Sequence, residues 1–253
     1  MKTIKNILYG NTAPESQILD LYLPDSDCFS VYVHIHGGGI ENGDKSDADF
    51  IAPYLTERGV AVVAMNYRMY PSASYPDFIC DVAQAVAWTV ENISQYGACD
   101  GIYVGGSSAG GYMSMMLCFD KRWLAPYGID PSKLAGFVHN SGQPTAHFNV
   151  LRERGIDTRR VIIDESSPLY HIGTSDAYAP MMFIVSTNDM ENRYEQTMLT
   201  LSTLKHFGCD MNQVLLETLH GYHCHQDFNN DENGDNILAT IIYKLIQHTK
   251  NKG

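Results

Sequence analysis

The sequence lacks the features that mark membrane proteins and nucleic-acid-binding proteins. None of its apolar runs approaches the ~20 residues that a bilayer-spanning helix needs. Only 17 Lys and Arg residues stand against 29 Asp and Glu, which gives a net charge of −12, and no dense basic cluster offsets it. Because a negative surface repels phosphate backbones, we expect no nucleic-acid partner and no membrane span.

Paired cysteine motifs and targeting signals are also missing. The six cysteines are scattered and include no C-x-x-C pair, which is typical of reduced thiols. The first six residues lack the apolar stretch and the small-residue cleavage site of a signal peptide. We therefore expect a cytoplasmic protein. Internal repeats and linker-like stretches are absent too, so residues 1–253 are interpreted as a single domain.

Short apolar runs alternate with segments of helical spacing from residue 31 onward, after two alternating runs, at 4–8 and 17–23, that predict an antiparallel hairpin. The expected strands are 31–35, 60–67, 102–104, 134–140, 181–186 and 213–219, and the expected helices are 76–94, 109–119, 194–207 and 237–248. This order predicts an α/β fold with a mostly parallel central sheet and helices on both faces. Residues 143–179 show no clear strand, and we interpret them as a small cap or lid.

The most informative motif is Gly106-Ser107-Ser108-Ala109-Gly110, which lies between an expected strand and an expected helix. A G-x-S-x-G sequence in this setting is typical of a nucleophile elbow, where a serine at a tight turn projects its hydroxyl above the sheet edge. Ser108 is the central serine of the motif. Ser107 is the competing nucleophile, but in its frame an alanine stands where the closing glycine should be.

A serine nucleophile needs a base and an acid that orients the base, and in this arrangement they follow in the order serine, acid, histidine. Asp189 comes just after the strand 181–186 and is our candidate acid, with Glu191 as the nearest substitute. Three histidines follow the last strand. His223 comes after a glycine turn and is the preferred base, while His220 and His225 are the alternatives.

A second glycine-rich loop follows the strand 31–35 and reads His36-Gly37-Gly38-Gly39. Glycines let backbone N–H groups point inward without a Cβ in the way, as an oxyanion hole requires. We expect the N–H groups of Gly37, Gly38 and Ala109 to form that hole.

The histidine-rich loop also suggests a metal site, because several of its side chains are metal-ligand types: His220, His223, Cys224, His225 and Asp227. Their spacing fits no standard zinc pattern, and there is no partner cysteine pair. We expect neither a metal nor a cofactor.

These motifs resemble those of the α/β-hydrolases, in particular the hormone-sensitive-lipase-like esterases. The resemblance spans nearly the whole chain and is carried by His36–Gly39, Asn66-Tyr67-Arg68 with Tyr75-Pro76 and Asp81, Gly106–Gly111, Ser167-Pro168-Leu169, and Asp189 with His223. It implies an α/β-hydrolase fold, a Ser108/Asp189/His223 triad and cofactor-free hydrolysis of small carboxylic esters. This chain departs from the family at Asn66, where an aspartate is common, at Ser186, where the acid motif usually opens with glycine, and at Cys224, where glycine commonly follows the histidine.

The family's N-terminal cap helices have no counterpart, because strand-like sequence begins almost at once. A reduced cap implies an open pocket for short-chain or polar acyl esters, such as acetylated sugars. An amidase, for instance an aryl formamidase, would use the same residues, and a non-catalytic ligand-binding protein on the same scaffold is a third interpretation. We expect a small-molecule ester as substrate, while a homo-oligomer stays open.

Overall fold

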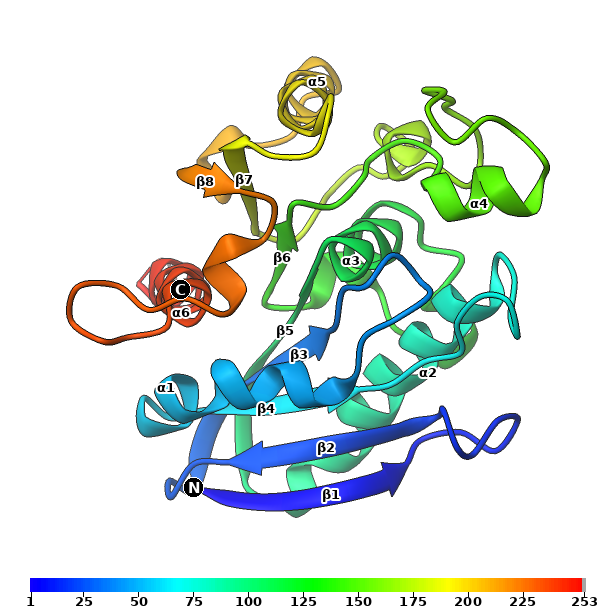
Figure 1. Ribbon diagram of the computed structural model, residues 1–253. Coiled ribbons are helices and arrows are strands. Elements are labelled where there is room, and N and C mark those ends of the chain that lie inside the picture. Colours follow the sequence, from blue (N-terminus) through cyan, green and yellow to red (C-terminus); the bar gives the residue numbers. More distant parts are fainter. Residues whose placement is uncertain (252–253) are drawn as a thin grey trace.

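A computed structural model, which describes residues 1–251, contains one eight-stranded sheet with helices on both faces (Figure 1). The strands lie side by side in the order β1-β2-β4-β3-β5-β6-β7-β8. β1 and β2 pair antiparallel with their neighbours, and the other six strands run parallel. The strands are β1 (Lys2–Leu8), β2 (Ile18–Leu23), β3 (Cys28–Ile35), β4 (Val60–Met65), β5 (Ala98–Ser107), β6 (Gly136–Asn140), β7 (Met181–Asn188) and β8 (Val214–Tyr222).

Six α-helices accompany the sheet: α1 (Ala52–Glu57), α2 (Asp77–Asn92), α3 (Ala109–Phe119), α4 (Phe148–Glu153), α5 (Arg193–His206) and α6 (Ile237–Lys250). Residues of α2, α3 and α5 share one hydrophobic cluster with the sheet, and residues of α1 and α6 share a second cluster. Figure 1 shows the two groups on opposite sides of the central strands. The sheet is therefore buried between two helical layers, as its continuous apolar strands require.

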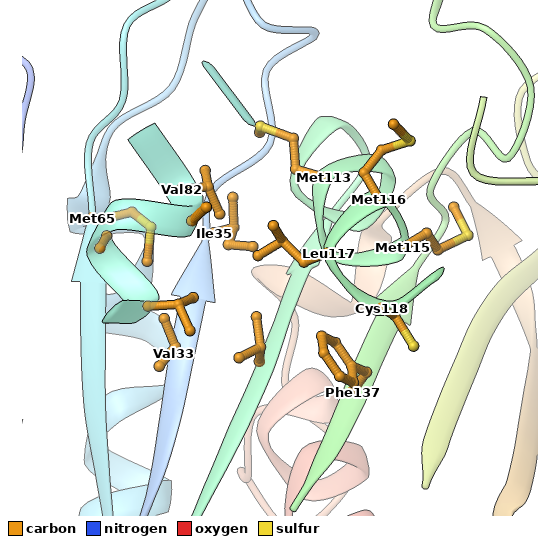
Figure 2. Close-up of a cluster of buried hydrophobic side chains, with 14 of the residues drawn as sticks. Val33, Ile35, Met65, Val82, Met113, Met115, Met116, Leu117, Cys118 and Phe137 are labelled. Atoms are coloured by element: carbon orange, nitrogen blue, oxygen red, sulfur yellow. The ribbon is translucent and has the colours of Figure 1, made fainter. Parts of the chain in front are cut away.

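Along the central strands, alternate side chains point to opposite faces of the sheet. In β3, Val31, Val33 and Ile35 face the α2–α3 cluster, and Tyr32 faces the α1–α6 cluster. Figure 2 shows part of the first cluster, in which side chains of β3 and β4 meet those of α2 and α3: Val33, Ile35, Met65, Val82, Met113, Met116 and Leu117. All eleven residues of α3 are buried, so this helix lies in the interior rather than at the surface.

The architecture predicted from the sequence is confirmed, and the differences concern element boundaries. The strand before the serine motif is ten residues long instead of the expected 102–104, because it pairs with β3 from Cys28 to Ile35. The last strand continues to Tyr222 rather than ending at 219, because its end pairs with Asn188 of β7. The expected strand 60–67 ends at Met65. The short helices α1 and α4 were not expected, since six residues give no readable helical period.

Residues 143–179 contain α4 and a 3-10 turn, Pro168–His171, in otherwise irregular chain between β6 and β7. They are tied to the rest of the fold, because Asn149 Nδ2 donates to the Gly39 carbonyl and Tyr112 Oη donates to the Ser166 carbonyl. Their role as a cap stays a prediction. All six cysteines are free. Within residues 1–251, no helix is long and apolar enough to cross a bilayer.

Candidate active site

The turn between β5 and α3 holds Ser108 in a strained conformation. Its φ of 55° and ψ of −110° lie outside the regions that a non-glycine residue ordinarily occupies. The turn is packed tightly against β3: a Cβ on Gly110 would lie 2.0 Å from the Ile35 carbonyl oxygen. Only a glycine fits there, and this close packing keeps the serine at the C-terminal edge of the sheet.

The structure brings Ser108, His223 and Asp189 into one hydrogen-bonded chain. His223 Nε2 lies 2.9 Å from Ser108 Oγ, and His223 Nδ1 lies 2.5 Å from Asp189 Oδ1. Asp189 directly follows β7 and His223 directly follows β8. Because β5, β7 and β8 are parallel, their C-terminal ends meet at the same edge, and residues far apart in sequence converge.

The carboxylate of Asp189 is fully buried and well supplied with donors. Besides His223, it accepts hydrogen bonds from Ser141 Oγ at 2.8 Å and from the Met190 N–H at 2.7 Å. Burial acts to raise the pKa of Asp189, but the hydrogen bond and charge of His223, together with the other donors, hold it below its ordinary value. The carboxylate is therefore ionised at neutral pH and holds the imidazole with its Nδ1 proton toward Asp189.

The competing residues lie elsewhere. Ser107 Oγ accepts a hydrogen bond from Asn140 Nδ2 at 2.8 Å, so its hydroxyl belongs to a different network from that of Ser108. His225 Nδ1 lies 3.0 Å from the Tyr222 carbonyl oxygen. The side chains of His220 and Glu191 are exposed. The structure therefore does not bring these four alternatives into the chain formed by Ser108, His223 and Asp189.

The glycine loop after β3 is oriented by two side chains. Tyr67 Oη donates to the His36 carbonyl at 3.0 Å, and His36 Nδ1 donates to the Gly37 carbonyl at 2.8 Å. In a planar trans peptide the C=O and the following N–H point in opposite directions. Fixing these two carbonyls therefore turns the N–H groups of Gly37 and Gly38 away from Tyr67 and the His36 ring.

The same loop lies directly beside the serine turn. A Cβ on Gly37 would lie 3.1 Å from the Ser107 carbonyl oxygen and 3.5 Å from Ser108 Cβ. Gly38 has a φ of +98°, and a Cβ there would lie 2.0 Å from the Asn42 carbonyl oxygen. Burial lowers the pKa of His36 to about 4, so its ring is neutral and acts as a hydrogen-bond donor. Gly37, Gly38 and Ala109 as an oxyanion hole remain a prediction consistent with this placement.

A polar network behind the serine turn was missed by sequence reasoning. Asn140 Nδ2, at the end of β6, donates to Asp227 Oδ1 at 2.8 Å as well as to Ser107, and Gln226 Nε2 donates to Asn140 Oδ1. Burial raises the pKa of Asp227 to about 7, against the hydrogen bonds from Ser107 and Asn140. This network ties the loop that carries His223 to β5 and β6. The only available signal was the position of Asp227, four residues after His223.

Asp227 and its neighbours in the histidine loop do not gather around a common point. Across residues 1–251, no group of three or more His, Cys, Asp or Glu side chains is arranged to hold a metal ion. Cys224, the departure from the family pattern, has a φ of 52° and places its Sγ 3.6 Å from His223 Nε2. Burial raises the pKa of this thiol well above its ordinary value, so it is neutral beside the imidazole.

Several known proteins are similar to this chain. Residues 19–133 match the family model described as BD-FAE. Over 203 residues, 71% of this chain and 46% of the relative, the sequence is 30% identical to a "Probable carboxylic ester hydrolase LipM" from Mycobacterium tuberculosis. Over 139 residues, 54% of this chain and 45% of the relative, it is 30% identical to a "Kynurenine formamidase" from Salmo salar. The chain thus spans less than half the length of these curated relatives.

Among solved structures, Esterase B from Lactobacillus rhamnosis (HN001) superposes with a TM-score of 0.78 at 18% identity, covering 99% of this chain and 87% of that one. At this identity the likeness establishes the fold. Together with the parallel sheet, this match shows that the chain has the α/β-hydrolase fold, and its sequence is similar to those of curated esterases.

Proposed function

We propose that this chain is a serine carboxylic-ester hydrolase that works through an acyl-enzyme. The observation that carries the proposal is the unbroken hydrogen-bonded chain from Ser108 through His223 to the buried Asp189. A hydroxyl, an imidazole and a carboxylate in this order supply a nucleophile, a base and a group that orients the base. The similarity to LipM, named as a probable carboxylic ester hydrolase, supports the same reaction class.

In the proposed reaction, His223 Nε2 takes the proton of Ser108 as its Oγ attacks the ester carbonyl carbon. The carbonyl oxygen becomes an oxyanion that accepts hydrogen bonds from the N–H groups of Gly37, Gly38 and Ala109. His223 then gives the proton to the departing alcohol oxygen, which leaves Ser108 acylated. Water attacks the acyl-enzyme by the same route, releasing the acid and restoring the serine. An oxyanion-hole donor is worth about 2.7–4 kcal/mol in such barriers.

Small, short-chain esters are the proposed substrates, with acetylated sugars as one form. A cavity of about 310 Å³ is lined in part by residues 190–193, which directly follow Asp189, and its volume is at the lower end of those usual for ligand sites. Faster cleavage of p-nitrophenyl octanoate than of p-nitrophenyl acetate would contradict this preference.

Hydrolysis of an activated amide is the second candidate, and the similarity to a kynurenine formamidase is the specific observation that favours it. The same chain of hydrogen bonds would serve, because only the leaving group changes from an oxygen to a nitrogen. Parallel assays of acetyl esters and N-formyl aromatic amides separate the two. We expect the esters to have the higher kcat/KM.

The test of the proposal as a whole is covalent labelling with a fluorophosphonate probe, followed by peptide mapping. We expect a single adduct on Ser108 and loss of ester hydrolysis in proportion to labelling. An unlabelled protein that hydrolyses no ester would support the remaining interpretation, a non-catalytic ligand-binding protein on a hydrolase scaffold.

A further inference from the structure

The cavity beside the catalytic acid is unusually rich in arginine. Its lining comes from the segment 143–161 and from the start of α5, and it includes Arg159, Arg160 and Arg193 but only one carboxylate, that of Glu191. The whole chain carries just 17 Lys and Arg residues against a net charge of −12. Arg159 forms an ion pair with Asp157, with 2.6 Å between Nη2 and Oδ2, so Arg160 and Arg193 are the two cations that bear on this cavity, against the one carboxylate of Glu191.

Arg193 is the most informative of the three. Its side chain is only 4% exposed, although its guanidinium carries a full charge. In the part of the chain that the structure describes, no carboxylate lies within 4 Å of the Arg193 or Arg160 guanidinium, and the one hydrogen-bond acceptor of Arg193 is the Ser141 carbonyl. The nearby Asp189 carboxylate, which accepts from the same Ser141 whose carbonyl accepts from Arg193, offsets part of the cost of burying this charge. A further anionic partner would offset more of it.

The position of Arg193 links the cavity to the reaction site. Ser141 has a φ of 49°, and in this conformation its hydroxyl donates to Asp189 while its carbonyl accepts from Arg193. On the other side of the cavity, the ring of Phe148 contacts the glycine loop: a Cβ on Gly39 would lie 3.0 Å from its tip. The cavity is thus bounded by the segments that position the catalytic acid and the proposed oxyanion hole.

The cavity also has unused hydrogen-bonding capacity. Gln196 lies one helical turn after Arg193 on α5, and its Oε1 is buried with no hydrogen-bond partner. An apolar acyl group would offer the Arg193 N–H donors no acceptor. The Gln196 oxygen is itself an acceptor, so it needs a donor from the substrate or from water and does not bind the carboxylate. A polar, negatively charged group would satisfy the guanidinium with charge-assisted hydrogen bonds, for which arginine and carboxylate are geometrically matched.

We infer that this cavity is a subsite for a carboxylate carried by the ester substrate, with Arg193 as the residue that binds the carboxylate and Arg160 as a second cation at the rim. This inference rests on the proposed esterase function and names its substrate class. The substrates are small esters that carry a free carboxylate. The carboxylate belongs to either the acyl half or the alcohol half of the ester.

Two pairs of esters test the inference, each matched in length and differing in charge. Monomethyl glutarate and methyl pentanoate place the difference in the acyl half, and 3-acetoxypropanoate and propyl acetate place it in the alcohol half. Acid release is followed by pH-stat for the wild type, Arg193→Met, Arg193→Lys and Arg160→Gln. Arg58→Gln is the matched control, because Arg58 stacks on Tyr54 at the end of α1, far from α5 in Figure 1.

For the wild type we expect one of the two anionic esters to have a kcat/KM at least about tenfold above that of its neutral partner. Arg193→Met should lower this anionic-to-neutral ratio on the order of 10- to 100-fold. Arg193→Lys should keep part of the ratio, Arg160→Gln should lower it a few-fold, and Arg58→Gln should leave it unchanged. The exposed Arg160 gives a readout even where substitution of the buried Arg193 prevents folding.

The outcomes distinguish a failure of the proposed subsite from a failure of the proposed esterase function. If the wild type cleaves the neutral esters but prefers neither anionic ester, or if Arg193→Met lowers both members of a pair equally, the subsite is refuted and the esterase function stands. If the wild type cleaves none of the four esters and resists the fluorophosphonate probe, the proposed function fails and the inference falls with it.

Discussion

Ser107 and Ser108 are neighbours in the chain, yet their hydroxyls belong to separate hydrogen-bond networks. Ser108 Oγ lies 2.9 Å from the imidazole of His223, whereas Ser107 Oγ accepts from Asn140 Nδ2. The separation follows from the backbone, because Ser107 is the last residue of a strand and Ser108 is the strained turn residue after it. The G-x-S-x-G motif alone does not decide which serine is the nucleophile, whereas the different hydrogen-bond partners of the two hydroxyls favour Ser108.

Ser108→Ala should therefore reduce kcat for p-nitrophenyl acetate by about 10⁴-fold or more, because the nucleophile is lost. Ser107→Ala is the matched control and should keep activity within about tenfold, since it removes only one hydrogen bond behind the turn. Circular dichroism of both variants checks that the fold is intact. An inactive Ser107→Ala together with an active Ser108→Ala would overturn the assignment.

A second prediction concerns the base. His223→Ala should lower kcat by a comparable factor, because without the imidazole the serine hydroxyl keeps its proton. His220→Ala removes an exposed imidazole of β8 and should leave kcat unchanged within error. Steady-state kinetics with the two variants side by side provide the measurement. Equal losses in both would show that the loop as a whole, rather than one imidazole, matters.

The glycine loop gives a third prediction. Tyr67→Phe deletes the hydroxyl that fixes the His36 carbonyl, so the N–H groups of Gly37 and Gly38 should lose their alignment. We expect kcat to fall about tenfold with little change in KM, since the loss acts on the transition state. Tyr9→Phe is the control, because Tyr9 Oη donates to the nearby Asn66 carbonyl without touching the loop. A Tyr67→Phe enzyme with normal kcat would contradict this role.

A fourth prediction uses the raised pKa of Asp227, about 7 in the folded state against about 3.9 in an unfolded chain. Between these values the folded protein binds more protons than the unfolded one, so this group makes stability fall as pH rises through 7. Asp227→Asn keeps an acceptor but cannot ionise. Its stability relative to the wild type should therefore rise by on the order of 1 kcal/mol or more from pH 5 to pH 7.5, as measured by urea unfolding.

Asp231→Asn is the matched control in the same loop, and its stability relative to the wild type should stay nearly constant from pH 5 to pH 7.5, because Asp231 titrates below this window. Backbone hydrogen bonds from Asp235 and its neighbours lower the pKa of Asp231, so its contribution is present at neutral pH and is lost as pH falls through the folded pKa. If both variants show the same pH trend, a general charge effect explains the data better than the buried carboxyl.

The sequence predicted those parts of the site that depend on local chemistry. The serine turn needs small residues in consecutive positions, and the glycine loop needs backbone free of Cβ atoms, so both leave a readable motif. The order of strands and helices then placed Asp189 and His223 at the correct sheet edge. What remained open was the choice among three histidines, because the extension of β8 from residue 219 to Tyr222 decides which imidazole reaches the serine.

Contacts between segments that are far apart in the sequence correspond to no local motif, so they could not be predicted from it. Ser141 has a positive φ, and in this conformation its hydroxyl donates to Asp189 and its carbonyl accepts from Arg193. The neighbouring sequence does not signal that conformation. Asp227 was considered only as a metal ligand, because its contact with Asn140 spans 87 residues. Arg193 directly precedes the helix expected at 194–207, and no sequence pattern there signals its burial.

The complete burial of α3 bears on how this protein can change over evolutionary time. A helix at the surface, such as α2, offers alternating positions where new side chains are accepted at little cost. In α3 no such positions exist. In a saturation mutagenesis experiment, substitutions should therefore be poorly tolerated at all eleven positions, without the periodicity of about 3.6 residues that a surface helix shows. We therefore expect variation to accumulate in the loops around this helix, while the helix itself keeps Ser108 in place.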